Sequence, residues 1–102
     1  MLLGIMINGL QVEEAKALTA GDVLNKMSSK EQSSYVAGVV GGLAQARWIK
    51  DQPDTSGMQC ISGWFYNGQR EKWNQINTWF NRHLDKPANA LLYVLIKKEC
   101  GE

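Results

Sequence analysis

The chain has 102 residues, of which 44% are hydrophobic and 21% charged, and its net charge is +1. These values are typical of one small globular domain with a modest core. The near-neutral charge without a dense basic patch argues against a nucleic-acid partner, and no apolar run has the length of a transmembrane segment.

The first residues resemble a secretory signal. Residues 1–7 form the short apolar run MLLGIMI, and Ala15–Ala17 has the small-x-small pattern of a signal-peptidase site. Two glutamates precede that site and no basic segment begins the chain, so a flexible arm or an ordinary helix is the alternative. We expect residues 1–18 to be a signal-like or flexible segment and residues 19–102 to be a helical domain, located in the periplasm or secreted.

A short helix is predicted at residues 19–27, where Thr19 and Asp22 fit a capping pattern. Its apolar side consists of Val23, Leu24 and Met27. A long helix follows at once, from Ser28 to Lys50, with a capping box formed by Ser28 and Glu31 or, one residue on, by Ser29 and Gln32. Apolar residues at three- and four-residue steps predict its buried stripe: Val36, Val39, Val40, Leu43 and Ala46.

Three glycines interrupt this long helix: Gly38, Gly41 and Gly42. Each is about 1 kcal/mol less favourable than alanine in a helix interior. They fit neither a phosphate-binding glycine loop nor a membrane dimer motif. We interpret them as a site of tight core packing, where a larger side chain such as leucine at Gly42 would overpack the contact.

The stretch from Asp51 to Gly57 is predicted to be an exposed loop, because Pro53 excludes a continuing helix and Asp54 and Gly57 favour turns. Exposed loops on helical scaffolds often carry binding functions. It is either a plain connector or a partner-binding loop, and the candidate residues are Asp51, Pro53, Asp54, Thr55 and Ser56.

The following segment, residues 58–67, contains three consecutive aromatic residues, Trp64, Phe65 and Tyr66. On a helix they cannot all face one core, so at least one is expected to be partly exposed. They form either a lid over the core or a partner-binding patch, since Trp and Tyr are enriched at interface centres. The candidates for such a patch are Trp64, Phe65, Tyr66, Asn67 and Gln69.

Two further helices complete the domain. Residues 69–83 present Trp73, Ile76 and Phe80 on one face. Residues 85–100 begin near Pro87, which suits a first turn, carry a leucine-rich stripe and are followed by Gly101 as a C-cap. The only histidine, His83, comes near a helix end, where a capping or surface role is more common than a catalytic one.

The two cysteines, Cys60 and Cys100, lie forty residues apart and form either a disulfide or a pair of buried thiols. A disulfide closing that loop would contribute roughly 4 kcal/mol and would require an oxidising compartment. With two cysteines, one histidine and no C-x-x-C, a zinc site is not expected. We find no acid–base pair, metal cluster or cofactor loop, and we therefore expect no enzyme activity, catalytic residue, cofactor or metal.

The order of motifs resembles a known family. The sequence YVAGVVGGLAQA, from Tyr35 to Ala46, is followed by Cys60-Ile61, by an amphipathic helix that ends in HLDKPA (residues 83–88), and by a leucine-rich helix that closes with Cys100. This pattern resembles the Tai/Rap family of immunity proteins, which protect bacteria from type VI secretion amidase effectors. The resemblance covers residues 19–100. Its most specific parts are Y-x-x-G-x-x-x-G-L-A, the CI dipeptide and the last cysteine.

The resemblance implies a small all-helical periplasmic protein, often a homodimer, with a disulfide between Cys60 and Cys100. It also implies a protein partner, a peptidoglycan amidase effector that is neutralised by a loop inserted into its cleft. The loop candidates on this chain are residues 51–57 and 64–69.

The alternative is a periplasmic acid-stress chaperone of the HdeA type, or a helical domain of another, unknown function. In either case the expected fold is all-α, a small bundle of four to five helices with one disulfide. Residues 28–50 are expected at its centre, with residues 69–83 and 87–100 packed on them.

Overall fold

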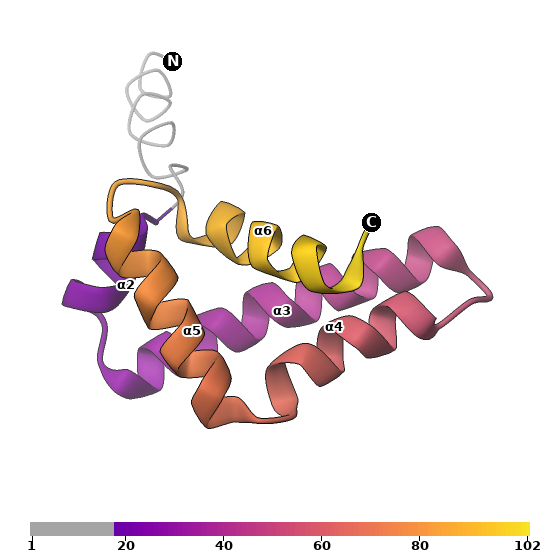
Figure 1. Ribbon diagram of the computed structural model, residues 1–102. Helices are drawn as coiled ribbons and strands as arrows, with labels where there is room; N and C mark the ends of the chain where they lie inside the picture. The colour runs from indigo at the N-terminus through magenta and orange to yellow at the C-terminus, as the bar shows by residue number, and fades with distance from the viewer. Residues whose placement is uncertain (1–17) are drawn as a thin grey trace, which may run out of the picture.

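The computed structural model describes residues 18–102, which form five α-helices and no β-strand (Figure 1). The helices are α2 (Ala20–Lys26), α3 (Ser29–Asp51), α4 (Ser56–Tyr66), α5 (Gln69–Arg82) and α6 (Ala88–Cys100). The expected all-α bundle of four to five helices is thereby confirmed. Residues 1–17, and with them nearly all of the signal-like segment, lie outside the described part of the chain.

The α3–α4 hairpin is the longest feature of the fold (Figure 1). The two helices run antiparallel, α6 lies across both, and α2 and α5 pack together at the end away from the α3–α4 turn. Backbone hydrogen bonds tie the start of the described chain to the α5–α6 loop: the Ala88 N–H donates to the Leu18 carbonyl over 2.8 Å, and the Ala20 N–H donates to the Lys86 carbonyl over 2.9 Å.

Both predicted capping boxes are present. The Glu31 N–H donates to Ser28 Oγ over 3.1 Å, and the Ser28 N–H donates to Glu31 Oε1 over 2.9 Å. Thr19 and Asp22 make the same reciprocal pair at the start of α2, over 3.0 and 3.1 Å. Each box satisfies backbone donors that a helix start leaves free, so the local sequence determines where α2 and α3 begin.

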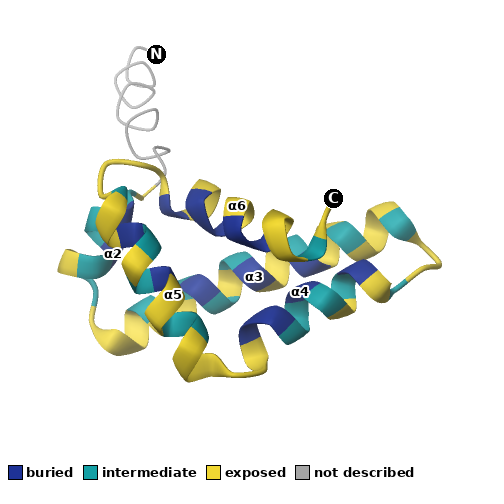
Figure 2. Cartoon of the chain, viewed as in Figure 1, coloured by how far each residue is buried: buried dark blue, intermediate teal, exposed yellow. Residues whose placement is uncertain are grey.

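The core lies between the five described helices (Figure 2). On α3 it buries Val36, Val40 and Ala44, while Val39 and Leu43 are partly buried. The stripe is therefore narrower than predicted, and Ala46 is exposed. From the other helices the core receives Ala20, Val23, Ile61, Trp64, Phe65, Ile76, Phe80, Ala88, Leu91, Leu92, Leu95 and Ile96.

The prediction of tight packing at the three glycines of α3 is wrong. A Cβ atom built on Gly38, Gly41 or Gly42 has no heavy atom within 4 Å, and all three residues are exposed. Gly38 and Gly42 each follow a buried valine by two positions, about 200° around the helix, and so they face away from the core.

The chain does require glycine at two other places. Gly57 is buried in α4, and a Cβ atom there would overlap the Arg47 guanidinium of α3. Gly68 precedes α5 with φ of 74°, a left-handed conformation that side chains other than glycine rarely adopt. Gly57 was expected in a loop, but α4 begins one residue before it.

The segment of residues 58–67 is not a lid. It belongs to α4, a continuous helix on which Ile61, Trp64 and Phe65 repeat at three- and four-residue steps and face the core. Trp64 and Phe65 are 5% and 2% exposed, whereas Tyr66 is 55% exposed. Partial exposure of one of the three aromatics was expected, and this is confirmed.

The last two helices end near their predicted limits. α5 stops at Arg82, with His83 as its C-cap, and Trp73, Ile76 and Phe80 face inward as predicted. Pro87 is the N-cap of α6 rather than part of its first turn, and Gly101 is the C-cap, as expected. Cys60 and Cys100 form a disulfide with Cα atoms 5.8 Å apart, which ties the end of α6 to the middle of α4.

Candidate binding surfaces

The first candidate surface is the turn of the α3–α4 hairpin, residues Gln52–Thr55, which we call the hairpin tip. It projects beyond the end of α6 (Figure 1). Gln52, Pro53 and Asp54 are exposed, and Thr55 is partly so. The predicted loop extended from Asp51 to Gly57, but Asp51 ends α3 and Ser56 begins α4, so the tip has only four residues.

Local hydrogen bonds hold the hairpin tip in one shape. The Asp54 N–H donates to the Asp51 carbonyl over 2.9 Å, and the Ser56 N–H donates to Asp54 Oδ1 over 2.9 Å. The bond from Ser56 lowers the pKa of the Asp54 carboxyl below its usual 3.8, and Arg47 adds a smaller effect of the same sign. Asp54 is therefore an exposed, permanently negative group at neutral pH.

Arg47 supports the tip from within α3, and sequence reasoning missed it. Its Nε donates to Asp51 Oδ2 over 2.6 Å, and both side chains are mostly buried, at 15% and 23% exposed. Arg47 also donates to the carbonyls of Cys100 and Gly101, over 3.4 and 3.2 Å. The i,i+4 spacing of Arg47 and Asp51 was the available signal, but the contacts with α6 depend on the tertiary fold.

The second candidate surface, residues 64–69, is smaller than expected. Trp64 and Phe65 belong to the core, where Phe65 packs edge-on against Trp73 with ring centroids 6.3 Å apart. Only Tyr66, Asn67 and Gln69 of the candidate residues remain exposed. This surface and the hairpin tip lie at opposite ends of α4, so the structure does not bring the two sets of candidates together.

The lone histidine lies against an aromatic ring. The His83 imidazole packs edge-on to Trp79, with centroids 4.5 Å apart. Within residues 18–102 no group of three or more His, Cys, Asp and Glu side chains is placed to hold a metal ion. None of the described helices is both long and apolar enough to cross a membrane.

Comparison of the chain with family models, with curated proteins and with solved structures gave no match. The geometry of these surfaces and the resemblance carried by the sequence motifs are therefore what bears on function.

Proposed function

We propose that this protein binds another protein through the hairpin tip, and that it acts in the periplasm as an immunity-type inhibitor of a peptidoglycan amidase. The observation that carries the proposal is the short, projecting and internally hydrogen-bonded tip. A loop that already holds one shape loses little conformational entropy on entering a cleft, and this favours tight binding.

Two further observations support this setting. The Cys60–Cys100 disulfide fits an oxidising compartment such as the periplasm. Just behind the tip, Arg47 pairs with Asp51 within α3, and the same Arg47 side chain packs closely against Gly57 of α4, so the tip is supported by both helices.

The test uses the tagged, disulfide-bonded protein as bait for periplasmic extract of the native organism. We expect recovery of a peptidoglycan amidase in a stoichiometric complex, and inhibition of that enzyme in a peptidoglycan-hydrolysis assay. Asp54→Arg on the tip should abolish both effects. Asn67→Arg, at a residue that is also exposed but lies at the other end of α4, is the matched control and should retain them.

Recovery of no amidase, or undiminished inhibition by Asp54→Arg, would contradict the proposal. Sedimentation of the same samples tests the homodimer that the family resemblance implies, since a dimer and a monomer differ twofold in mass.

A second candidate function, an acid-stress chaperone, is favoured by the role of carboxylates at helix starts. Asp22 accepts a hydrogen bond from the Thr19 N–H at the start of α2, and Asp54 accepts one from the Ser56 N–H at the start of α4. These hydrogen bonds hold the pKa of both carboxyls below 3.8. Protonation of both carboxyls, as the pH falls through the lowered pKa values, weakens both contacts. Loss of the near-UV circular dichroism signal at about pH 2–3, together with suppression of client aggregation, would support this function; native tertiary structure at that pH would exclude it.

A further inference from the structure

The exposed glycines of α3 have no role in the packing of the fold. Gly38 and Gly42 are less favourable than alanine in a helix interior, and no neighbour needs the space that their missing side chains leave. Both residues line a groove between α3 and α6, opposite Ala90 and Tyr93. A larger side chain at either glycine would project into this groove.

The groove continues toward the end of α3 into an apolar cavity. Leu43 and Tyr93 line both parts, and the cavity wall is completed by Ile61 and Ile96. We call the two parts together the α3–α6 groove. Its cavity has a volume of about 190 Å³, below the roughly 300–1,000 Å³ of sites that hold drug-sized ligands. The cavity therefore suits a side chain of a partner better than a cofactor.

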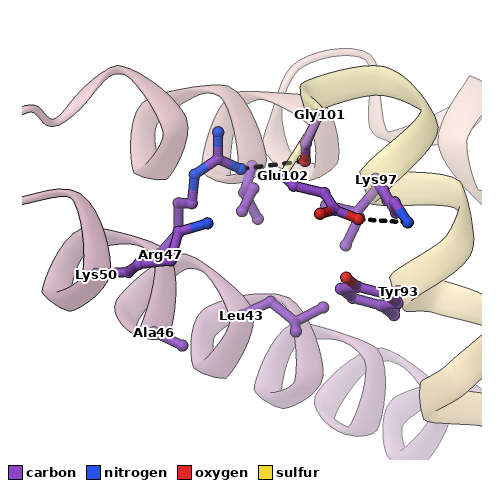
Figure 3. Close-up of a pocket in the computed structure, with 10 residues that line it drawn as sticks. Leu43, Ala46, Arg47, Lys50, Tyr93, Lys97, Gly101 and Glu102 are labelled. Atoms are coloured by element: carbon purple, nitrogen blue, oxygen red, sulfur yellow. Dashed lines mark hydrogen bonds and ion pairs between the residues drawn. The ribbon is translucent and has the colours of Figure 1, made fainter.

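Three cations line the cavity: Arg47, Lys50 and Lys97 (Figure 3). The chain's own residues Gly101 and Glu102 lie among them. The Glu102 carboxylate pairs with Lys97, and the Arg47 guanidinium donates to the Gly101 carbonyl over 3.2 Å. Lys97, and more weakly Lys50 and Arg47, lower the pKa of the Glu102 carboxyl.

This end of the groove thus already contacts a carboxylate and backbone carbonyls of the chain itself, at Gly101 and Glu102. Arg47 contacts backbone carbonyls, which every peptide has, and Lys97 contacts a carboxylate. The Glu102 side chain remains 59% exposed. Its ion pair with Lys97 is therefore a surface pair that contributes little free energy, and a competing carboxylate replaces it easily.

We propose that the α3–α6 groove binds an acidic, extended segment of a protein partner, which places apolar side chains over Gly38 and Gly42 and replaces the Glu102 carboxylate at Lys97. Gly38 and Lys50 are twelve positions apart, which is about 18 Å along the helix, the length of five or six extended residues. This surface is distinct from the hairpin tip, and the proposal does not depend on the identity of the tip's partner.

The probe is a fluorescently labelled, capped six-residue peptide with leucines in its first half and two glutamates at its end. Binding to the disulfide-bonded full chain is followed by fluorescence anisotropy. We expect saturable binding, and binding roughly tenfold weaker for the matched peptide with glutamine in place of glutamate, because a hydrogen bond to a charged group is lost. Glu102→Gln should tighten binding of the acidic peptide, because it removes the internal competitor.

The glycines provide a variant and a control on the same helix. Gly42→Leu places a side chain in the groove from a position where the added Cβ atom has no heavy atom within 4 Å, whereas Gly41 is also exposed but does not line the groove. We expect Gly42→Leu to weaken peptide binding at least about tenfold and Gly41→Leu to leave it unchanged, with both variants folded by circular dichroism.

Three results would overturn the proposal. The first is no saturable binding of the acidic peptide to the wild type or to Glu102→Gln. The second is equal binding by the Gly42→Leu and Gly41→Leu variants. The third is a wild-type dimer in sedimentation that Gly42→Leu converts to monomer, since the groove would then be covered by a second copy of the chain. Because Asp54→Arg leaves the groove intact, failure of the amidase experiment and failure of this one are distinguishable.

Discussion

Replacing the three exposed glycines of α3 by alanine should make the protein more stable. None of the three Cβ atoms that Gly38→Ala, Gly41→Ala and Gly42→Ala would add meets a heavy atom within 4 Å, so no overpacking opposes the change. Each substitution removes flexibility from the unfolded chain and improves helix propensity by about 0.4–1 kcal/mol. The triple variant should therefore gain roughly 1–3 kcal/mol in the free energy of unfolding.

For a domain of this size 1 kcal/mol corresponds to roughly 4–8 °C in Tm. Urea and thermal denaturation, followed by far-UV circular dichroism with the disulfide intact, measure both quantities. Gly57→Ala is the control, because its Cβ atom would overlap the Arg47 guanidinium and should lower the stability by about 1–3 kcal/mol. A triple variant less stable than the wild type would contradict this prediction, since the glycines would then pack against another part of the molecule.

Three more predictions test the core, the disulfide and a cap. Phe80→Ala, at a side chain with no exposed surface, should lower the free energy of unfolding in urea by about 3–5 kcal/mol; a loss below 1 kcal/mol would mean that Phe80 is not central to the core. Joint replacement of Cys60 and Cys100 by serine should remove about 4 kcal/mol by the same measurement, and two free thiols in the unreduced, denatured wild type would contradict the disulfide itself. Asp22 accepts a hydrogen bond from the Thr19 N–H and pairs with Lys26, and both contacts lower its pKa below 3.8. Its stabilising effect is therefore complete at neutral pH and disappears as the pH falls through the lowered pKa, so the Tm difference between the wild type and Asp22→Asn should close on acidification; a difference that does not shrink as the pH is lowered would show that the charge is not its source.

Local signals in the sequence were sufficient for the helices. The boxes at Thr19 and Ser28 predicted the starts of α2 and α3, Gly101 predicted the end of α6, and the spacing of Trp73, Ile76 and Phe80 predicted the inner face of α5. These features depend on residues within one or two turns of each other, and such short-range patterns are visible without the fold.

The errors concern residues whose neighbours come from another helix. The helix-breaking tendency of glycine predicts contact points at Gly38 and Gly42, yet which face of α3 is covered depends on where α4 and α6 pack. Local turn preference predicts a loop at Gly57, but this residue makes the close contact between α3 and α4. The aromatic composition predicts a surface patch that includes Trp64 and Phe65. Because α4 begins at Ser56, these two residues instead share one helical face with Ile61, and that face is buried.

Arg47 contacts both proposed surfaces, so a substitution of Arg47 does not distinguish them. Its guanidinium pairs with Asp51 at the base of the hairpin tip and donates to the carbonyls of Cys100 and Gly101 at the cavity. Arg47→Ala would loosen both surfaces at once, because it also leaves Asp51 partly buried without its cation. Loss of binding in that variant would therefore support neither proposal over the other. Asp54→Arg changes only the tip and Gly42→Leu changes only the groove, so a partner that responds to one of them and not to the other identifies the surface it uses.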